Sequence, residues 1–281
     1  MMEKTSSVVL LLKKYGISPK KSLGQNFLSS GFYLEKIVQA ASVTHNSCVL
    51  EIGPGLGSLT RYLAASAGRV TAVELDPKLV EILQTELKDT PNVKVIHGDI
   101  LAVPLDQLDL EEGYVVVANI PYYITSAIIR RLLEAPVKPH RILLTIQREV
   151  ADRVCALPGE MSLLSLSVQV YGLPKRVLTI PAEAFYPAPS VDSAVLLIDL
   201  YPKPLIPAEN LDTFFTLSKA GFSQKRKTLR NSLSGGLGWK PDSVETLLAE
   251  AGIDAKRRAE TLSLDEWGRL TAGFKALAGA S

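Results

Sequence analysis

The sequence contains little cysteine and histidine, and each shortage excludes a class of protein. Two cysteines in 281 residues, Cys48 and Cys155, are too few for the disulfide framework of a small secreted domain. Cys48 stands inside an apolar run, where a small buried residue is expected rather than a nucleophile. The three histidines, His45, His97 and His140, lack the spacing of metal ligands, so no metal site is predicted.

Long apolar runs are absent as well. The run Val8–Leu12 is shorter than a signal-peptide core or a membrane span, and Lys13 and Lys14 follow it directly. We therefore expect a short helix with one apolar face at this place, no membrane association and a cytoplasmic protein. Nothing in the sequence demands an oligomer, so a monomer is expected.

Charge is nearly balanced over the chain but is unevenly distributed. The net charge is +2 at pH 7, and residues 201–281 carry 12 basic and 9 acidic side chains. Residues 219–231 hold five basic side chains and no acidic one, and the first 30 residues hold five lysines and one glutamate. A solvated helix face explains such clusters as readily as nucleic-acid binding does, so charge alone decides nothing here.

Apolar, β-branched runs alternate with helix-like segments through the first two thirds of the chain. This alternation predicts an α/β fold with a doubly wound parallel sheet, whose strands are apolar because helices cover both faces. The expected strands are Cys48–Ile52, Arg69–Glu74, Val93–His97, Tyr114–Asn119 and Arg141–Gln147. The expected helices are Gly57–Ala67, Pro77–Lys88 with Asp76 as its N-cap, and Ser126–Glu134.

The pattern changes after Gln147. Strands expected at Leu163–Tyr171, Val177–Ile180 and Val195–Leu200 would complete the sheet with an antiparallel edge. A proline-rich linker at 201–207 precedes four expected helices, at Asp212–Ala220, Thr228–Leu233, Asp242–Ala251 and Asp265–Ala276. We predict a Rossmann-like domain of residues 1–200, in which 1–19 form an N-terminal extension, and a small helical domain of residues 201–281.

Candidate ligand-binding residues stand at the ends of three neighbouring strands. Gly53 and Gly55 permit a close backbone approach to a ligand, but Ser58 replaces the third glycine of a dinucleotide-binding turn. A tight turn without a ligand explains these glycines about as well by themselves. Glu74 ends the next strand, where an acidic side chain can accept hydrogen bonds from two ribose hydroxyls. Asp99 can accept one from an adenine amine, although an aspartate at this place is often a simple turn residue.

These features would line one crevice, since open α/β sheets bind ligands at the carboxyl ends of their strands. Together, over residues 48–120, they resemble the S-adenosylmethionine site of the Rossmann-like methyltransferases.

The fourth strand ends in Asn119-Ile120-Pro121-Tyr122, which is similar to the Asn-x-Pro-Tyr signature of amino-group methyltransferases. An exocyclic adenine amine is a weak nucleophile because its lone pair is delocalised into the ring. The Asn119 side-chain oxygen and the Ile120 carbonyl can accept hydrogen bonds from its N–H groups, and Tyr122 offers a ring on which the base stacks. No strong base is needed, so catalysis would rest mainly on positioning. Phe185 is the candidate for the other face of the base, although a phenylalanine before prolines is more often a packing residue.

The chain as a whole resembles one family, the small-subunit (16S) ribosomal RNA adenine dimethyltransferases. The resemblance runs from about Lys20 to near the C-terminus. The segments that carry it are Lys21-Ser22-Leu23-Gly24-Gln25-Asn26-Phe27-Leu28, Glu51–Thr60, Asn119–Tyr122, Gln147-Arg148-Glu149-Val150-Ala151, Phe185–Ser193, Arg226–Asn231 and Arg258–Ser263.

The resemblance implies dimethylation of two adjacent adenines in a hairpin near the RNA 3′ end, in a late small-subunit precursor. It implies S-adenosylmethionine as cofactor, covered by Asn26 and Leu28, with Gly53, Glu74, Asp99 and Asn119 completing the site. With this resemblance, the basic residues of 219–231 are better interpreted as phosphate contacts. The predicted RNA-binding residues are Lys225, Arg226, Lys227 and Arg230.

Three alternatives remain open at this point. The related large-subunit RNA methyltransferases that give macrolide resistance share the Asn-Ile-Pro-Tyr signature, but Gly24 and the segment Val191-Asp192-Ser193 favour the small-subunit family. A non-catalytic assembly factor would bind the immature subunit through its basic faces, although the intact Asn119–Tyr122 motif opposes a loss of catalysis. DNA adenine methylation is the weakest alternative, because no target-recognition module is identifiable.

Overall fold

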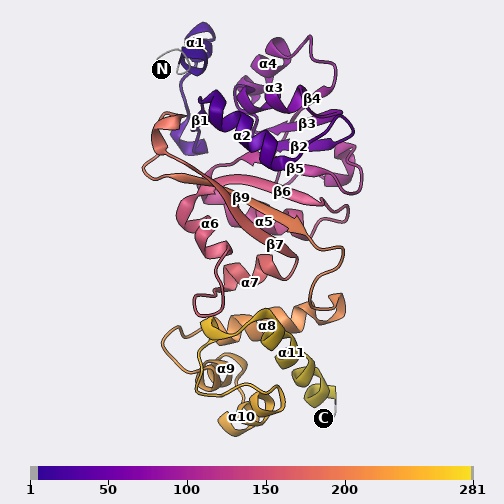
Figure 1. Cartoon of the computed structure of the whole chain (residues 1–281), viewed down its shortest axis with the longest axis vertical. Coiled ribbons are helices and arrows are strands. Elements are labelled where there is room, and N and C mark those ends of the chain that lie inside the picture. Colours follow the sequence, from indigo (N-terminus) through magenta and orange to yellow (C-terminus); the bar gives the residue numbers. More distant parts are fainter. Residues whose placement is uncertain (1–5, 280–281) are drawn as a thin grey trace. The chain divides into compact units, whose positions relative to one another are not determined.

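The computed structural model describes residues 6–279, which form two compact units. The first unit combines the described residues up to 151 with residues 174–200. The second combines residues 152–173 with the described residues from 201 onward. Each unit has a core of its own. Figure 1 shows the sheet of the first unit and the helices of the second.

A seven-stranded sheet forms the centre of the first unit, in the order β4-β3-β2-β5-β6-β9-β7. Five strands are parallel, β9 runs antiparallel to β6, and β7 forms the edge. The predicted α/β fold with an antiparallel edge is therefore confirmed. The strands are β2 (Cys48–Ile52), β3 (Arg69–Glu74), β4 (Val93–His97), β5 (Val115–Asn119), β6 (Arg141–Gln147), β7 (Gly172–Ile180) and β9 (Ser193–Leu200).

The order of the strands creates a binding crevice. From β2 the chain continues to β3 and β4 on one side of the sheet. It then returns past β2 to β5 and β6 on the other side, so the strand order reverses between β2 and β5. The carboxyl ends of strands diverge at such a switch point, which is where doubly wound sheets bind ligands.

Helices and a small second sheet complete the first unit. Helix α4 begins as predicted, since the Asp76 side chain accepts a hydrogen bond from the Lys78 amide at 3.1 Å. Helices α2 and α3 bury Leu34 and Leu59 against sheet residues such as Val117. The helices are α1 (Ser6–Lys14), α2 (Gly31–Ala41), α3 (Ser58–Ala64), α4 (Pro77–Glu86), α5 (Thr125–Leu133) and α6 (Arg148–Val154), the last of which continues into the second unit. Strands β1 (Phe27–Leu28) and β8 (Phe185–Tyr186) pair antiparallel.

The second unit is helical. Its core surrounds Trp267 and Phe214, which are both 0% exposed. The described helices are α7 (Leu163–Gln169), α8 (Leu211–Phe222), α9 (Leu229–Leu237), α10 (Pro241–Glu250) and α11 (Leu264–Gly279).

The strand predicted at Leu163–Tyr171 is wrong, because the segment folds as helix α7. Leucine, serine and valine alternate here with the period of a strand, which suggested an edge of the sheet. Ser162 instead caps a helix, since its hydroxyl accepts from the Ser165 amide while the Ser165 hydroxyl accepts from the Ser162 amide. Leu166 and Val170, four residues apart, then pack into the helical core.

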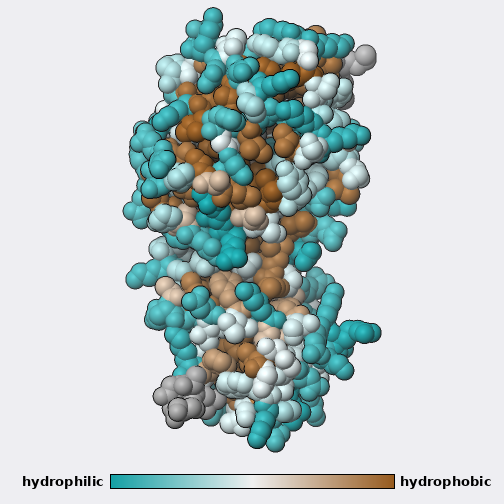
Figure 2. Space-filling model, turned by 180° about the vertical axis from the view of Figure 1, so that it is seen from behind, coloured by the Kyte–Doolittle hydropathy of each residue, from teal (hydrophilic) through white to brown (hydrophobic). Residues whose placement is uncertain are grey.

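Hydrophilic side chains cover much of the face shown in Figure 2, with hydrophobic side chains exposed between them. Within the part of the chain that the structure describes, none of the helices combines the length and apolar character that a bilayer crossing requires.

Candidate cofactor and active site

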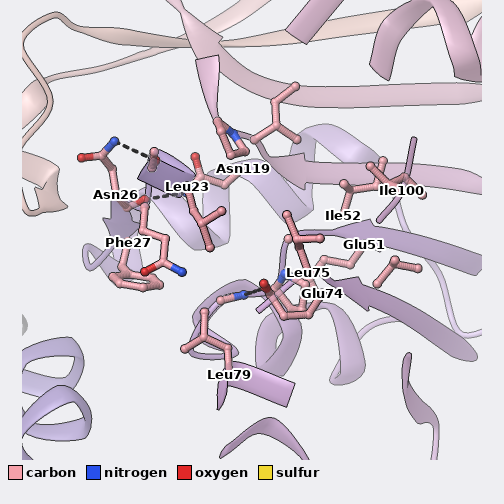
Figure 3. A pocket seen from close by; sticks show the side chains of 18 of the residues that line it. Leu23, Asn26, Phe27, Glu51, Ile52, Glu74, Leu75, Leu79, Ile100 and Asn119 are labelled. Atoms are coloured by element: carbon pink, nitrogen blue, oxygen red, sulfur yellow. Dashed lines mark hydrogen bonds between the residues drawn. The ribbon is translucent and has the colours of Figure 1, made fainter. Parts of the chain in front are cut away.

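A cavity lies at the carboxyl ends of β2, β3, β4 and β5, at the switch point of the sheet (Figure 3). Its walls come from segments that are far apart in sequence, within residues 23–28, 51–59, 73–79, 98–100 and 119–124. The structure brings every predicted cofactor-binding residue to this cavity. These residues are Asn26, Leu28, Gly53, Gly55, Glu74, Asp99 and Asn119.

The glycine-rich turn forms the floor of this site. Gly53 and Gly55 have φ angles of +68° and +62°, in the left-handed region that favours glycine. A Cβ atom on Gly55 would lie 3.0 Å from the ring of Phe27, so a larger residue would push this ring out of place. The turn therefore allows a ligand to approach the backbone closely.

Glu74 is held rigidly at the end of β3. Its two carboxylate oxygens accept hydrogen bonds from the backbone amides of Asp76 at 2.9 Å and Gly55 at 3.0 Å. Burial raises the pKa of Glu74, while these two amides oppose the shift. Each oxygen retains a lone pair, so the side chain can still accept hydrogen bonds from ribose hydroxyls.

Glu51 is a second buried carboxyl at the cavity, and the sequence analysis assigned it no separate role. Its side chain is 1% exposed, and its Oε2 atom has no hydrogen-bond partner among the described residues. Burial raises the pKa of Glu51 to about 8, and the nearby charge of Glu74 acts in the same direction. Glu51 is therefore largely protonated at neutral pH and can donate or accept a hydrogen bond.

The remaining wall is suited to a nucleoside base. Ile52, Leu75 and Ile100 provide apolar surface (Figure 3). Asp99 is exposed, and its Oδ1 atom accepts a hydrogen bond from the Leu101 amide at 2.9 Å. Apolar walls, a ribose acceptor, an acceptor for an adenine amine and a glycine turn together fit the nucleoside part of S-adenosylmethionine.

Residues 20–28 form a cover over one side of the cavity, which we call the N-terminal cover. Asn119 Nδ2 donates to the Asn26 carbonyl at 3.1 Å, which joins the cover to the end of β5 (Figure 3). Lys20 Nζ lies 2.7 Å from Asp76 Oδ2, and Gln25 Nε2 donates to the same oxygen at 3.2 Å. Although burial opposes it, these contacts lower the pKa of Asp76, so a charged carboxylate holds the cover in place.

The predicted catalytic segment borders the same cavity. Because the Asn119 amide nitrogen donates to the cover, the amide orientation is fixed and the Oδ1 atom is left as an acceptor. The half-buried Tyr122 donates to, or accepts from, the hydroxyl of the buried Ser193 at 2.7 Å. Burial raises the pKa of Tyr122, which keeps its phenol neutral.

Phe185 is not brought to the cavity with Asn119 and Tyr122. It is 4% exposed and packs with Leu28 and Leu34 in the core beneath β1. Tyr186, the next residue, is 39% exposed. The ring of Phe185 thus has the packing role that the sequence left open for it.

The predicted RNA-binding residues lie in the second unit, three of them in the turn between α8 and α9 and Arg230 in the first turn of α9. Lys225, Arg226 and Lys227 are exposed. Arg230 is partly buried and pairs with two acidic side chains, Asp242 at 3.3 Å and Glu245 at 2.8 Å. Three of the four side chains are therefore available to phosphates, whereas the charge of Arg230 is already compensated.

The family model described as ribosomal RNA adenine dimethylase matches residues 16–275 of this chain. The chain belongs to this family. It is accordingly an S-adenosylmethionine-dependent enzyme that dimethylates adenine in ribosomal RNA. Among its relatives in the adenine dimethylase family, the chain is 46% identical to ribosomal RNA small subunit methyltransferase A of Dehalococcoides mccartyi, covering 92% of this chain and 90% of the relative. It is 44% identical to the protein of the same name from Bacillus pumilus, covering 93% of both chains.

Solved structures support the dimethylase fold. The 23S rRNA methyltransferase ErmE is 29% identical and superposes with a TM-score of 0.72, covering 89% of this chain and all of that one (100%). A dimethyladenosine transferase from Plasmodium falciparum is 23% identical with a TM-score of 0.76, over 90% of this chain and 98% of that one. The predicted family and fold class are both confirmed.

Proposed function

We propose that the protein transfers methyl groups to the N6 amines of two adjacent adenines in a hairpin near the 3′ end of 16S rRNA. The products are N6,N6-dimethyladenosines, and the substrate is the small (30S) ribosomal subunit or its late precursor. We expect the enzyme to be a cytoplasmic monomer. The observation that carries the proposal is the single cavity shared by the glycine turn, Glu74 and the segment Asn119–Tyr122.

Several residues of the cavity are placed to hold S-adenosylmethionine, which supplies an electrophilic methyl group when bound. Glu74 accepts hydrogen bonds from the ribose hydroxyls, and Asp99 accepts one from the adenine amine of the cofactor. Gly53 and Gly55 let the backbone approach it, and the N-terminal cover, with Asn26 and Leu28, excludes water from it.

The segment Asn119–Tyr122 acts on the target adenine. The Asn119 Oδ1 atom accepts a hydrogen bond from the N6 amine, and the Ile120 carbonyl offers a second acceptor. These hydrogen bonds draw the amine hydrogens out of the plane of the ring. The nitrogen lone pair is then no longer delocalised into the ring and can attack the methyl group. Tyr122 stacks on the base, and the hydrogen bond to Ser193 fixes its ring. The nitrogen becomes acidic once it has taken the methyl group and releases one proton to solvent, so positioning and hydrogen bonding suffice without a general base.

Two other functions compete with this one. The similarity to ErmE supports a large-subunit substrate, but the relatives at 44% and 46% identity are named for the small subunit. An assembly factor without catalysis would not need the fixed amide of Asn119.

The decisive experiment is tritiated methyl transfer to undermethylated small subunits, with large subunits in parallel, followed by mapping of the modified nucleotides. We expect dimethyladenosine at two neighbouring positions near the 3′ end of the small-subunit RNA. Label confined to large-subunit RNA would show that the proposed small-subunit substrate is wrong. Bound subunits without any label would favour the assembly factor.

Asn119→Ala tests the mechanism in the same assay. At saturating cofactor we expect kcat to fall by about a hundredfold or more, because a preorganised hydrogen bond to the reacting group is lost. Binding to small subunits should persist, because Asn119 belongs to the first unit and the basic turn at 225–227 to the second. Asn46→Ala, at an exposed asparagine, is the matched control. Full activity of Asn119→Ala would show that the assigned role of this side chain is wrong.

A further inference from the structure

Two consecutive tyrosines at the cavity have opposite environments. Tyr122 is half-buried and hydrogen-bonds to the buried Ser193, which accounts for its orientation. Tyr123 also lines the cavity but is 64% exposed, and its hydroxyl has no hydrogen-bond partner among the described residues. Core packing therefore does not explain an aromatic residue at position 123.

The backbone beneath the Tyr123 ring is nevertheless fixed. The residue lies in a 3-10 turn, Tyr122–Ile124, which is closed by a hydrogen bond from the Ile124 amide to the Pro121 carbonyl at 3.3 Å. The hydroxyl of the buried Thr125 donates to the Tyr122 carbonyl at 3.1 Å. Tyr123 is therefore presented from a rigid base and not from a loose loop.

One side of the Tyr123 ring rests against the N-terminal cover. A Cβ atom on Gly24 would lie 3.4 Å from Tyr123 Cε1 and 3.1 Å from Pro121 Cβ, so the absent side chain at Gly24 makes room for the ring. The ring thus borders the cavity and keeps the larger part of its surface open to a ligand.

An exposed lysine lies on the turn of the N-terminal cover that ends at Gly24. This residue is Lys21, whose carbonyl accepts a hydrogen bond from the Gly24 amide at 3.0 Å. Lys20 is occupied by Asp76, whereas Lys21 has no ion pair among the described residues. Proteins bind an unstacked nucleotide of a single strand with an exposed aromatic ring and cationic side chains, and the turn at 21–24 and Tyr123 supply one of each.

We propose that Tyr123 stacks on the nucleotide next to the adenine that is being methylated, while Lys21 contacts its phosphate. The inference rests on the proposed function, because it requires a target base that enters the cavity from an RNA strand. The neighbouring nucleotide of that strand then lies at the mouth of the cavity, where Tyr123 is exposed. Because the two target adenines are adjacent, the base that stacks on Tyr123 is the second adenine, which is methylated afterwards.

Tyr123→Ala and Tyr123→Phe test the proposal on undermethylated small subunits. For Tyr123→Ala we expect KM for the subunit to rise by about tenfold, as for the loss of one base–aromatic stack. The share of RNA with only one of the two neighbouring adenines dimethylated should also rise. Tyr123→Phe should behave as the wild type, because the ring and not the hydroxyl makes the contact. Phe32→Ala, at another exposed aromatic residue, is the matched control.

Two further measurements distinguish a failure of this inference from a failure of the proposed function. Binding of S-adenosylhomocysteine, measured by calorimetry, should be unchanged in Tyr123→Ala, which shows that the cavity is intact. Wild-type KM and wild-type product distribution in Tyr123→Ala would overturn the inference while leaving the proposed function in place. A wild-type enzyme that labels no small-subunit RNA would overturn both.

Discussion

Glu51 and Glu74 are two buried carboxyl groups at one cavity, and their hydrogen bonding sets them apart. Glu74 receives a backbone amide on each oxygen, which stabilises its charged form. Glu51 lacks a partner for Oε2 among the described residues, and burial raises its pKa although the Thr60 side chain opposes the shift. The two carboxyl groups therefore differ in how far their surroundings stabilise the charged form.

We predict that Glu51 makes the stability of the protein fall as pH rises. The pKa of Glu51 is about 8 in the folded protein against an ordinary value of 4.5, so between these values the unfolded chain releases a proton that the folded chain retains. Below this range both states hold the proton, and above it both have lost it. Glutamine does not ionise, so Glu51→Gln lacks this loss. The free energy of unfolding in urea should therefore shift in favour of Glu51→Gln over the wild type, by a few kcal/mol, as pH rises through this range.

Glu183→Gln, at an exposed glutamate, should instead run parallel to the wild type. A constant difference between Glu51→Gln and the wild type across the range would mean that Glu51 is ionised in the folded protein.

The sequence was sufficient to find Glu74, Asp99 and Asn119, because each stands at the end of a strand in a sheet of known type. It could not find the free oxygen of Glu51 or the burial of Phe185. Both depend on which residues of distant segments pack together, as when Phe185 meets Leu28 across the β1–β8 pair. Spacing along the chain contains no information on such contacts.

At the scale of elements, helix α1 supports the cavity from outside. Val8 and Leu12 pack with Phe27, Leu56 and Leu79, and these last three also line the cavity. Tyr15 and Lys14 both contact Glu86 of α4, at 2.6 Å. The short amphipathic helix expected near Val8–Leu12 is confirmed, and its apolar face holds the wall that the N-terminal cover completes.

We predict that Leu12→Ala weakens cofactor binding severalfold more than it slows catalysis at saturation. The lost side chain is 5% exposed and leaves a cavity behind Phe27 and Leu56, which loosens the wall. Calorimetric titration with S-adenosylhomocysteine gives the affinity, and single-turnover transfer gives the rate. Leu10→Ala is the matched control, because Leu10 lies on the same helix but is 59% exposed. Equal cofactor affinities of the two variants would show that the packing of α1 does not support the cofactor site.

Element prediction succeeded where two signals agreed and failed where they conflicted. Strand β2 was predicted with its observed bounds because an apolar run and a following glycine turn both mark it. Helix α7 was missed because its alternation of residue types opposed the capping signal at Ser162, and contacts with Phe214 and Leu217 in the helical core decided the outcome.

At the scale of the whole molecule, the cavity and the basic turn belong to different units. The cavity lies wholly in the first unit, while the basic turn at 225–227 lies in the second. Residues 152–173 group with the helical unit, so this unit is built from two separate stretches of chain. The proline-rich composition at 201–207 marks only the third of the three places where the chain passes from one unit to the other.

We predict that Lys227 and Arg230 differ in their effect on subunit binding. Lys227→Ala should weaken binding and flatten the dependence of log Kd on log salt by about one unit, because one phosphate contact is lost. Arg230→Ala should leave this slope near that of the wild type, since Asp242 and Glu245 already compensate its charge. Filter binding to undermethylated subunits over a salt series measures both. If Arg230→Ala flattens the slope as much as Lys227→Ala, the ion pairs do not persist in the complex.

The position of β9 between β6 and β7 has a consequence for the growing chain on the ribosome. β7 is at the edge of the sheet beside β9, so it emerges before the strand that it will pair with has been made. Helix α7 emerges earlier still, and the core that receives it includes Leu262 and Leu270. Neither unit can therefore complete its core until late in translation, and the core of the second unit also requires Trp267 and Leu270 of α11.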